Sequence, residues 1–146
     1  MSPYYSNLRE ELGSRLLLMP GVAGIIHNSE GELLLQKKND GSWSLPAGAI
    51  EPSESPQEAI KREVLEETGY VVRDLKLIDV FGGADFRYTY SNGHEVENIV
   101  ILFLCFCESE PKKPSDDETV ELGFFSRTDF PGLSLPYPVA SLYLED

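Results

Sequence analysis

The chain has 146 residues, of which 41% are hydrophobic and 25% charged, an ordinary balance for a globular domain with a real core. Its formal net charge of −13 argues against a general nucleic-acid binder, because phosphate backbones are held mainly by Lys and Arg. The sequence has neither an apolar run long enough to span a membrane nor a signal-peptide pattern. We therefore expect a cytoplasmic protein with no membrane partner.

The first third of the chain predicts a short helix, two strands and a loop rich in Pro and Gly. A turn over Asn28–Gly31 favours pairing between the two strands. In chain order the predicted segments are the helix Pro3–Glu11, the strands Val22–His27 and Glu32–Lys38, and the loop Trp43–Ser53.

The strongest helix signal begins at Ser55. Ser55 is a favourable N-cap, Pro56 suits the first helical position, and Glu58 completes a capping box. Gly69 is typical of the position that ends a helix. These residues predict a helix that runs to Thr68.

The remaining elements are mostly strands. Asn92-Gly93 is a strong hairpin signal between two of them. Many strands around one or two helices predict an α/β or α+β sandwich with a mixed sheet. The predicted segments are the strand Val71–Phe81, the hairpin strands Phe86–Tyr90 and Glu95–Cys107, the polar loop Pro111–Asp117, the strand Val120–Phe125 and a short helix after Pro136.

The only two cysteines, Cys105 and Cys107, lie two residues apart in an apolar stretch. A metal site needs more ligands than this spacing offers, and free cysteines are commonly buried. We expect two packed core thiols in a reducing compartment.

Three carboxylates lie close together on the predicted helix. At about 100° per residue, Glu63, Glu66 and Glu67 fall within an arc of roughly 100°. Carboxylates so close must protonate or share a cation, and oxygen ligands suit Mg²⁺ and Mn²⁺. The alternative is an acidic, solvated helix face, which is common.

The loop before this helix extends the pattern. The stretch reads G, five residues, E, seven residues, R-E, one aliphatic residue, any residue, E-E, any residue, G, and it resembles the box of the Nudix (MutT-like) hydrolase family. Its fixed positions are Gly48, Glu54, Arg62, Glu63, Glu66, Glu67 and Gly69. The chain departs from the usual pattern at Ala47, Ser53 and Tyr70, and none of these changes removes a carboxylate.

The resemblance implies a Nudix-type α/β/α sandwich with a mixed central β-sheet. Residues 1–146 would form one Nudix hydrolase domain, with 1–15 as an N-terminal extension in which we expect a short helix. The specific part of the likeness covers about 28 residues of the chain, and a looser likeness covers most of it.

The resemblance also implies a metal site. Glu66 and Glu67 would be the main ligands of Mg²⁺ or Mn²⁺, Glu63 a further ligand or the general base, and the Ala47 carbonyl would complete the shell. Such a cation would also offset the repulsion between an acidic protein and a polyphosphate, which the protein could not otherwise bind.

Two further box residues are expected to support catalysis beside Glu63. Glu54 would act through water or the metal, and Arg62 would orient the neighbouring carboxylates. Some family members use a carboxylate outside the box, and Glu118 is our first candidate, although a plain surface charge is the alternative for it.

Aromatic residues that could stack on a nucleotide base are Trp43, Phe86, Tyr88 and Tyr90. Core packing is the alternative for each. Phe86, Tyr88 and Tyr90 alternate along one predicted strand and should share a face.

The resemblance predicts a hydrolase that cleaves a diphosphate bond in a small nucleoside diphosphate derivative by attack of water at phosphorus. Nucleotide sugars, dinucleoside polyphosphates and nucleoside triphosphates remain open as substrates, and so does a monomer or a homodimer. One alternative is a catalytically silent nucleotide sensor. Another is a cap-removing RNA enzyme, which the net charge disfavours.

Overall fold

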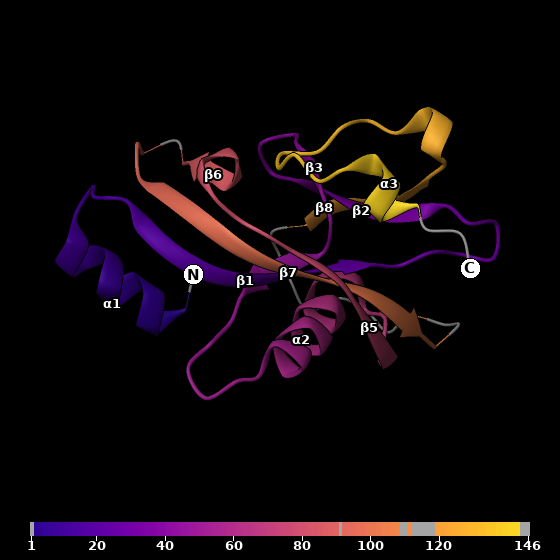
Figure 1. Cartoon of the computed structure of the whole chain (residues 1–146), viewed down its shortest axis with the longest axis horizontal. Coiled ribbons are helices and arrows are strands. Elements are labelled where there is room, and N and C mark those ends of the chain that lie inside the picture. Colours follow the sequence, from indigo (N-terminus) through magenta and orange to yellow (C-terminus); the bar gives the residue numbers. More distant parts are fainter. Residues whose placement is uncertain (1, 91, 109–110, 112–118, 144–146) are drawn as a thin grey trace.

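The fold is built from two β-sheets and few helices (Figure 1). The computed structural model describes residues 2–90, 92–108, 111 and 119–143. In chain order the elements are α1 (Pro3–Leu12), β1 (Leu17–Ile25), β2 (Leu33–Lys38), β3 (Trp43–Ser44), β4 (Ala47–Ala49), α2 (Pro56–Thr68), β5 (Val72–Phe81), the 3₁₀ turn η1 (Ala84–Phe86), β6 (Arg87–Thr89), β7 (Glu95–Cys107), β8 (Thr119–Phe125), the 3₁₀ turn η2 (Arg127–Asp129) and α3 (Val139–Leu142).

The larger sheet has the strand order β4-β1-β7-β5, with β6 also paired to β7. The strands β1 and β7 run parallel, and the other pairs in this sheet are antiparallel. The smaller sheet has the order β3-β2-β8 and is antiparallel throughout. A mixed sheet packed with helices confirms the predicted α+β sandwich.

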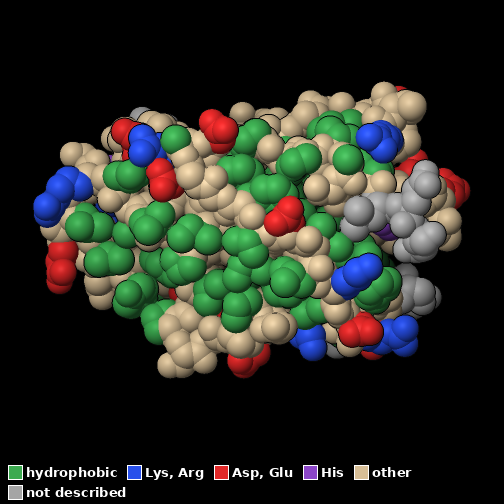
Figure 2. All heavy atoms as spheres, in the orientation of Figure 1, with side chains coloured by type: hydrophobic (Ala, Val, Ile, Leu, Met, Phe, Trp, Pro, Cys, Tyr) green, Lys and Arg blue, Asp and Glu red, His purple; other side chains and the backbone are tan. Residues whose placement is uncertain are grey.

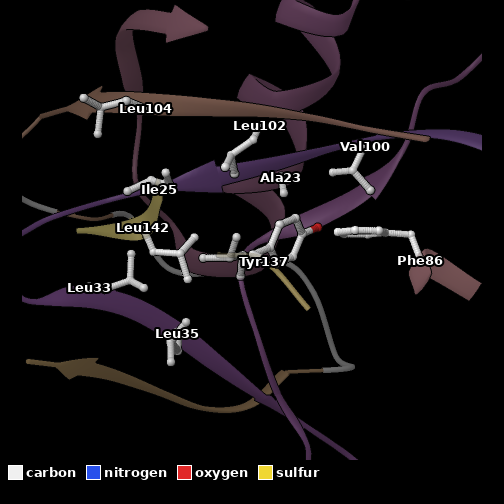
Figure 3. Close-up of a cluster of buried hydrophobic side chains, with 11 residues drawn as sticks. Ala23, Ile25, Leu33, Leu35, Phe86, Val100, Leu102, Leu104, Tyr137 and Leu142 are labelled. Carbon is white, nitrogen blue, oxygen red and sulfur yellow. The ribbon is translucent and has the colours of Figure 1, made fainter. Parts of the chain in front are cut away.

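The two sheets enclose the first core cluster (Figure 3). Side chains of β1 and β7, such as Ile25 and Leu102, face Leu33 and Leu35 of β2, and Leu142 of α3 fills the space beside them. All five are fully buried. Burial of such side chains stabilises the fold by about 1.5–3 kcal/mol each.

The helix α2 covers the opposite face of the larger sheet (Figure 1). Ile60 and Val64 point into the sheet and are fully buried. They can approach closely because β1 has Gly24 below them, where an added Cβ would lie 3.2 Å from Ile60 and 3.4 Å from Val64. The predicted capping box is present at Ser55, and Gly69 ends the helix in the left-handed conformation.

The predicted pairing of Val22–His27 with Glu32–Lys38 is wrong. The two strands lie in different sheets and meet only at an isolated bridge between His27 and Leu33. The first strand also begins earlier, at Leu17, and both of its edges are occupied, by β4 and by β7. Pairing with a distant strand therefore replaced the local hairpin that the turn favoured.

Two other predicted segments differ from the structure. The loop 43–53 contains the strands β3 and β4. Strand β4 pairs with β1, and Gly48 lies opposite Val22. Phe86 lies in η1 rather than in a strand, so it does not share a face with Tyr88 and Tyr90. Most of the polar loop 111–117 lies outside the described residues.

The predicted N-terminal helix is present as α1 and packs against one end of the larger sheet. Its Tyr5 is buried with Leu17, Met19 and Val96 in a separate cluster. Arg9 is also buried and donates hydrogen bonds to backbone carbonyls of neighbouring segments. The helix is thus fixed to the body of the fold.

No helix among the described residues is long and apolar enough to cross a membrane. Hydrophobic side chains gather over the centre of the face shown in Figure 2, where charged side chains are scattered. The larger sheet has exposed hydrophobic side chains at Leu18, Leu77, Val80 and Ile99. The expectation of a monomer or a homodimer stays a prediction.

Ser53, in the loop before α2, has a positive φ of 70° and an exposed side chain. A non-glycine residue in this region costs about 1–2 kcal/mol. We expect Ser53→Gly to stabilise the protein by about 0.5–1 kcal/mol, part of the relief being offset by chain entropy. Urea unfolding measures this change. Ser53→Ala keeps the strain and should bring no gain, so equal stability of the two variants would contradict the prediction.

Candidate active site

A cleft of about 790 Å³ lies where α2, β4 and α1 meet. Its wall combines residues of the acidic helix face with the backbone of β4 and with the N-terminal segment. The lining residues are Ser2, Tyr5, Met19, Lys38, Ala47, Gly48, Ala49, Glu51, Arg62, Glu63, Glu66, Glu67 and Tyr90. The four metal-site residues predicted from the sequence are therefore brought to one place.

Arg62 lies at the centre of the polar contacts. Its Nε and Nη2 donate to the two oxygens of Glu54 at 2.7 and 2.9 Å, a two-pronged pair. Its Nη1 donates to Glu63 at 2.7 Å and to Glu66 at 3.4 Å. Nη2 also donates to the Ala49 carbonyl at 3.1 Å. One guanidinium thus joins the loop, β4 and two residues of α2.

This network shifts the protonation of both partners. The hydrogen bond from Arg62 lowers the pKa of Glu54, and the bond to Glu54 is the main reason that the pKa of Arg62 is raised. The ion pair is therefore charged at neutral pH. Glu54 lies close to the predicted carboxylates through Arg62, although it does not line the cleft itself.

Glu63 lies directly against the backbone of β4. A Cβ added at Gly48 would fall 2.2 Å from the carboxyl carbon of Glu63, far inside van der Waals contact. Only glycine leaves this space, which explains why the box needs Gly48 at that position. Burial raises the pKa of Glu63, and the hydrogen bond from Arg62 opposes the shift.

Glu67 is 5% exposed, and its carboxylate binds the backbone of β4. Its Oε2 accepts the Ala47 N–H at 2.9 Å, and its Oε1 lies 3.5 Å from Lys38 Nζ. Burial raises the pKa of Glu67 to about 8, while Lys38 acts against this shift and Glu63 adds to it. This carboxyl is thus held in a place that disfavours its charged form.

The carbonyl of Ala47 points to the same side of strand β4 as the N–H of Ala47. In the pairing of β4 with β1, Gly48 is opposite Val22, and the backbone bonds beyond it join Gly24 to Pro46. Residues between such bonded pairs point their N–H and C=O away from the partner strand. The carbonyl of Ala47 therefore points toward α2 and the cleft.

The donor set of the cleft fits a hard divalent cation. Glu63, Glu66 and Glu67 supply carboxylate oxygens and Ala47 a carbonyl, the ligand types that Mg²⁺ and Mn²⁺ prefer. Among the described residues no three acidic, His or Cys side chains already converge as an assembled metal centre. Instead Arg62 bonds to two of the carboxylates.

The charges around the cleft also favour a bound cation. Among the described residues that line it, Lys38 and Arg62 are cationic, whereas Glu51, Glu63, Glu66 and Glu67 are acidic. Arg62 is already engaged by carboxylates. A phosphate group would be repelled here unless cations balance the acidic wall.

Three of the four aromatic candidates, Trp43, Phe86 and Tyr88, do not line the cleft. Trp43 packs edge-on against Phe125 at 4.8 Å in the core between the sheets. Phe86 is 6% exposed and packs beside Tyr137, as Figure 3 shows. The core-packing alternative therefore holds for both.

Tyr88 lies at the surface, where its hydroxyl donates to Asp40 at 3.0 Å. Its neighbour Tyr90, 43% exposed, is the aromatic residue of this hairpin that reaches the cleft. Glu118, the predicted extra carboxylate, lies outside the described residues.

Sequence reasoning did not single out six residues that line the cleft, which are Ser2, Tyr5, Met19, Lys38, Ala49 and Glu51. Lys38 ends a predicted strand and gave no motif, and Glu51 was one acidic residue among many. Ser2 and Tyr5 belong to the N-terminal extension, which carries no box residue. Only contacts between distant segments reveal these positions.

Comparison with known proteins gives a consistent result. A family model described as NUDIX domain matches residues 17–142. The chain is 32% identical over 128 residues to an ADP-ribose pyrophosphatase of Methanocaldococcus jannaschii, which covers 84% of this chain and 72% of that protein.

Two solved structures share the fold over most of their length. A MutT NUDIX hydrolase from Burkholderia pseudomallei superposes with a TM-score of 0.65 and 25% identity, covering 79% of this chain and 88% of its own. An ADP-ribose pyrophosphatase from Streptococcus suis gives a TM-score of 0.64 and 27% identity, covering 85% and 86%.

The burial of the Glu67 carboxyl predicts that the stability of the metal-free protein depends on pH. Its folded pKa of about 8 lies above the ordinary value of 4.5, so the folded state binds more protons between these values and stability falls as pH rises through this window. Glu67→Gln should therefore stabilise metal-free protein at pH 8 by up to about 4 kcal/mol and much less at pH 4. Urea unfolding in chelator measures both.

Glu10→Gln, which removes an exposed charge from α1, controls for the reduced net charge of −13. A gain for Glu67→Gln that is equal at pH 4 and pH 8, or equal to the gain of the control, would contradict the predicted burial cost.

Proposed function

The chain belongs to the Nudix family and is a hydrolase of phosphoric anhydride bonds, and from this premise we propose that it requires a divalent cation and cleaves a nucleoside diphosphate derivative. The main observation in support of this proposal is that Glu63, Glu66 and Glu67 line one cleft beside the backbone of β4. An acidic surface without function would not need a glycine cradle for one carboxylate or bury another.

Glu63, Glu66, Glu67 and the Ala47 carbonyl would hold Mg²⁺ or Mn²⁺. When bound, the cation would neutralise the diphosphate, polarise phosphorus and acidify a water molecule. Arg62 and Glu54 act as positioning residues, since their two-pronged pair fixes the carboxylates of α2 relative to β4.

Glu63 is our candidate for the proton acceptor. Its Oε1 accepts from Arg62, while its Oε2 has no hydrogen bond among the described residues. The oxygen of water would attack phosphorus, its proton would pass to Glu63, and the bond from phosphorus to the bridging oxygen would break. Either phosphorus of the diphosphate fits this scheme.

Lys38 is proposed to bind a phosphate oxygen. Two cationic residues line the described cleft wall, and Glu54 and Glu63 already bind one of them, Arg62. The Nζ of Lys38 lies 3.5 Å from Glu67. The long separation makes this a loose pair. A lysine head group so placed can turn toward an anionic substrate.

Small nucleotides are the expected substrates. Two of the compared proteins are named ADP-ribose pyrophosphatase, so nucleotide sugars come first among the candidates. Dinucleoside polyphosphates and nucleoside triphosphates are tested beside them.

The test is hydrolysis of this nucleotide panel with Mg²⁺, with Mn²⁺ and with chelator, the products being separated by chromatography. We expect turnover of one class that chelator abolishes and that the variant Glu66→Gln/Glu67→Gln lowers at least about 100-fold. Glu30→Gln, in an exposed turn, is the matched control. Full activity of the double variant would contradict the proposal, and tight binding without turnover would favour the silent sensor.

Gly48→Ala tests the position of Glu63. The new Cβ would fall on the carboxylate and displace it, so kcat should fall about 100-fold or more while the fold is kept. Gly82→Ala is the control, because its Cβ would meet neighbours no nearer than 3.7 Å. Equal kcat for the two variants would show that Glu63 need not lie against β4.

A further inference from the structure

Strand β2 buries one amide side chain in an apolar stretch. Gln36 is 0% exposed and follows Leu33, Leu34 and Leu35, each of which is at most 1% exposed. A polar group that is taken out of water costs free energy unless it is hydrogen-bonded. Gln36 is not a residue of the box, and it lies outside the set of side chains that line the cleft. Its burial therefore has to be explained by the groups that it contacts.

The side chain of Gln36 points toward helix α2. Leu33 and Leu35 point into the core between the two sheets, as Figure 3 shows, whereas Leu34 packs with the buried residues of α2. Alternate residues of a strand share a face, so Gln36 lies on the same side of β2 as Leu34. This side faces the C-terminal part of α2, where Glu67 lies.

The amide of Gln36 meets two acceptors there. Its Nε2 donates to the Leu45 carbonyl at 3.2 Å, and its side chain also donates a hydrogen bond to the carboxylate of Glu67. The NH₂ group of a glutamine carries two N–H donors, which these two acceptors match. Glu67 in turn accepts the N–H of Ala47, two residues after Leu45. Gln36 therefore joins the carboxylate of Glu67 to the segment that leads into β4.

A neutral donor suits a carboxylate that has to bind a cation. A cationic side chain in this place would neutralise the charge of Glu67 and compete with the metal, whereas an amide fixes the oxygen without adding charge. Carboxylates that bind metals are themselves hydrogen-bonded by such outer partners, which set their orientation. Lys38, whose Nζ is 3.5 Å from Glu67, constrains the carboxylate less because the contact is long.

We infer that Gln36 is a positioning residue, whose amide holds the carboxylate of Glu67 and the segment that carries Ala47 in the arrangement that a divalent cation needs. This inference rests on the proposed function, because it concerns the same cation site. It assigns part of the site to the smaller sheet β3-β2-β8, which carries no residue of the box.

The test measures Mn²⁺ binding by electron paramagnetic resonance, in which free Mn²⁺ gives the signal and no substrate is needed. Gln36→Met keeps an unbranched side chain of similar length and removes both N–H donors. We expect it to raise the Kd for Mn²⁺ about 10- to 100-fold. Leu35→Met is the matched control, because it changes a fully buried neighbour on the face of β2 away from α2, and it should keep the Kd within about 2-fold.

A second comparison separates a positioning role from a general loss of packing. In the Glu67→Gln background, Gln36→Met should change the Kd for Mn²⁺ less than about 3-fold, because the carboxylate through which Gln36 acts has been removed. An equal loss in both backgrounds would overturn the inference. If Glu67→Gln binds Mn²⁺ too weakly for a titration, the comparison of Gln36→Met with Leu35→Met decides.

Unchanged Mn²⁺ binding in Gln36→Met, or a loss of the same size in Leu35→Met, would overturn the inference and leave the proposed function intact. Absence of Mn²⁺ binding in the wild type would contradict the proposed function and the inference together. Melting temperatures identify a variant that does not fold, and Gln36→Leu then takes the place of Gln36→Met.

Discussion

The site depends on one guanidinium. Arg62 has five N–H donors, and its five hydrogen bonds reach Glu54 twice and Glu63, Glu66 and Ala49 once each. Carboxylates gathered on one helix face repel one another, and a fixed cation among them offsets that repulsion. Because the same group also binds β4, the helix face and the strand that oppose each other across the cleft are held in register.

The packing beneath the helix makes this arrangement possible. Gly24 lets Ile60 and Val64 lie directly on β1, which brings the acidic face of α2 against β4. The cost is the burial of Glu67, whose carboxyl accepts the Ala47 N–H, is hydrogen-bonded by Gln36 and forms a loose pair with Lys38. Such stored electrostatic cost is typical of functional sites, where a bound cation can relieve it.

What the sequence could predict was local. The capping box at Ser55 and the spacing of the box residues depend on neighbours within one loop and the helix that follows it, and the helix begins and ends as predicted. Pairing of β1 with β7 joins residues about 79 positions apart, such as Leu17 and Val96, and no local signal specifies it. For the same reason the sequence placed Phe86 in a strand rather than in the 3₁₀ turn η1, and it could not tell which of the aromatic candidates reaches the cleft. The metal-ligand roles themselves stay predictions that the fold accommodates.

The central claim is that the acidic wall of this cleft is a cation site. Crystals grown with Mn²⁺ and examined by anomalous diffraction would test it most directly, because the signal locates the metal without assumptions about activity. The account predicts anomalous density between α2 and β4, within ligand distance of Glu63, Glu66 or Glu67, with Arg62 still paired to Glu54. An empty cleft at saturating Mn²⁺, or metal bound only elsewhere on the surface, would contradict it.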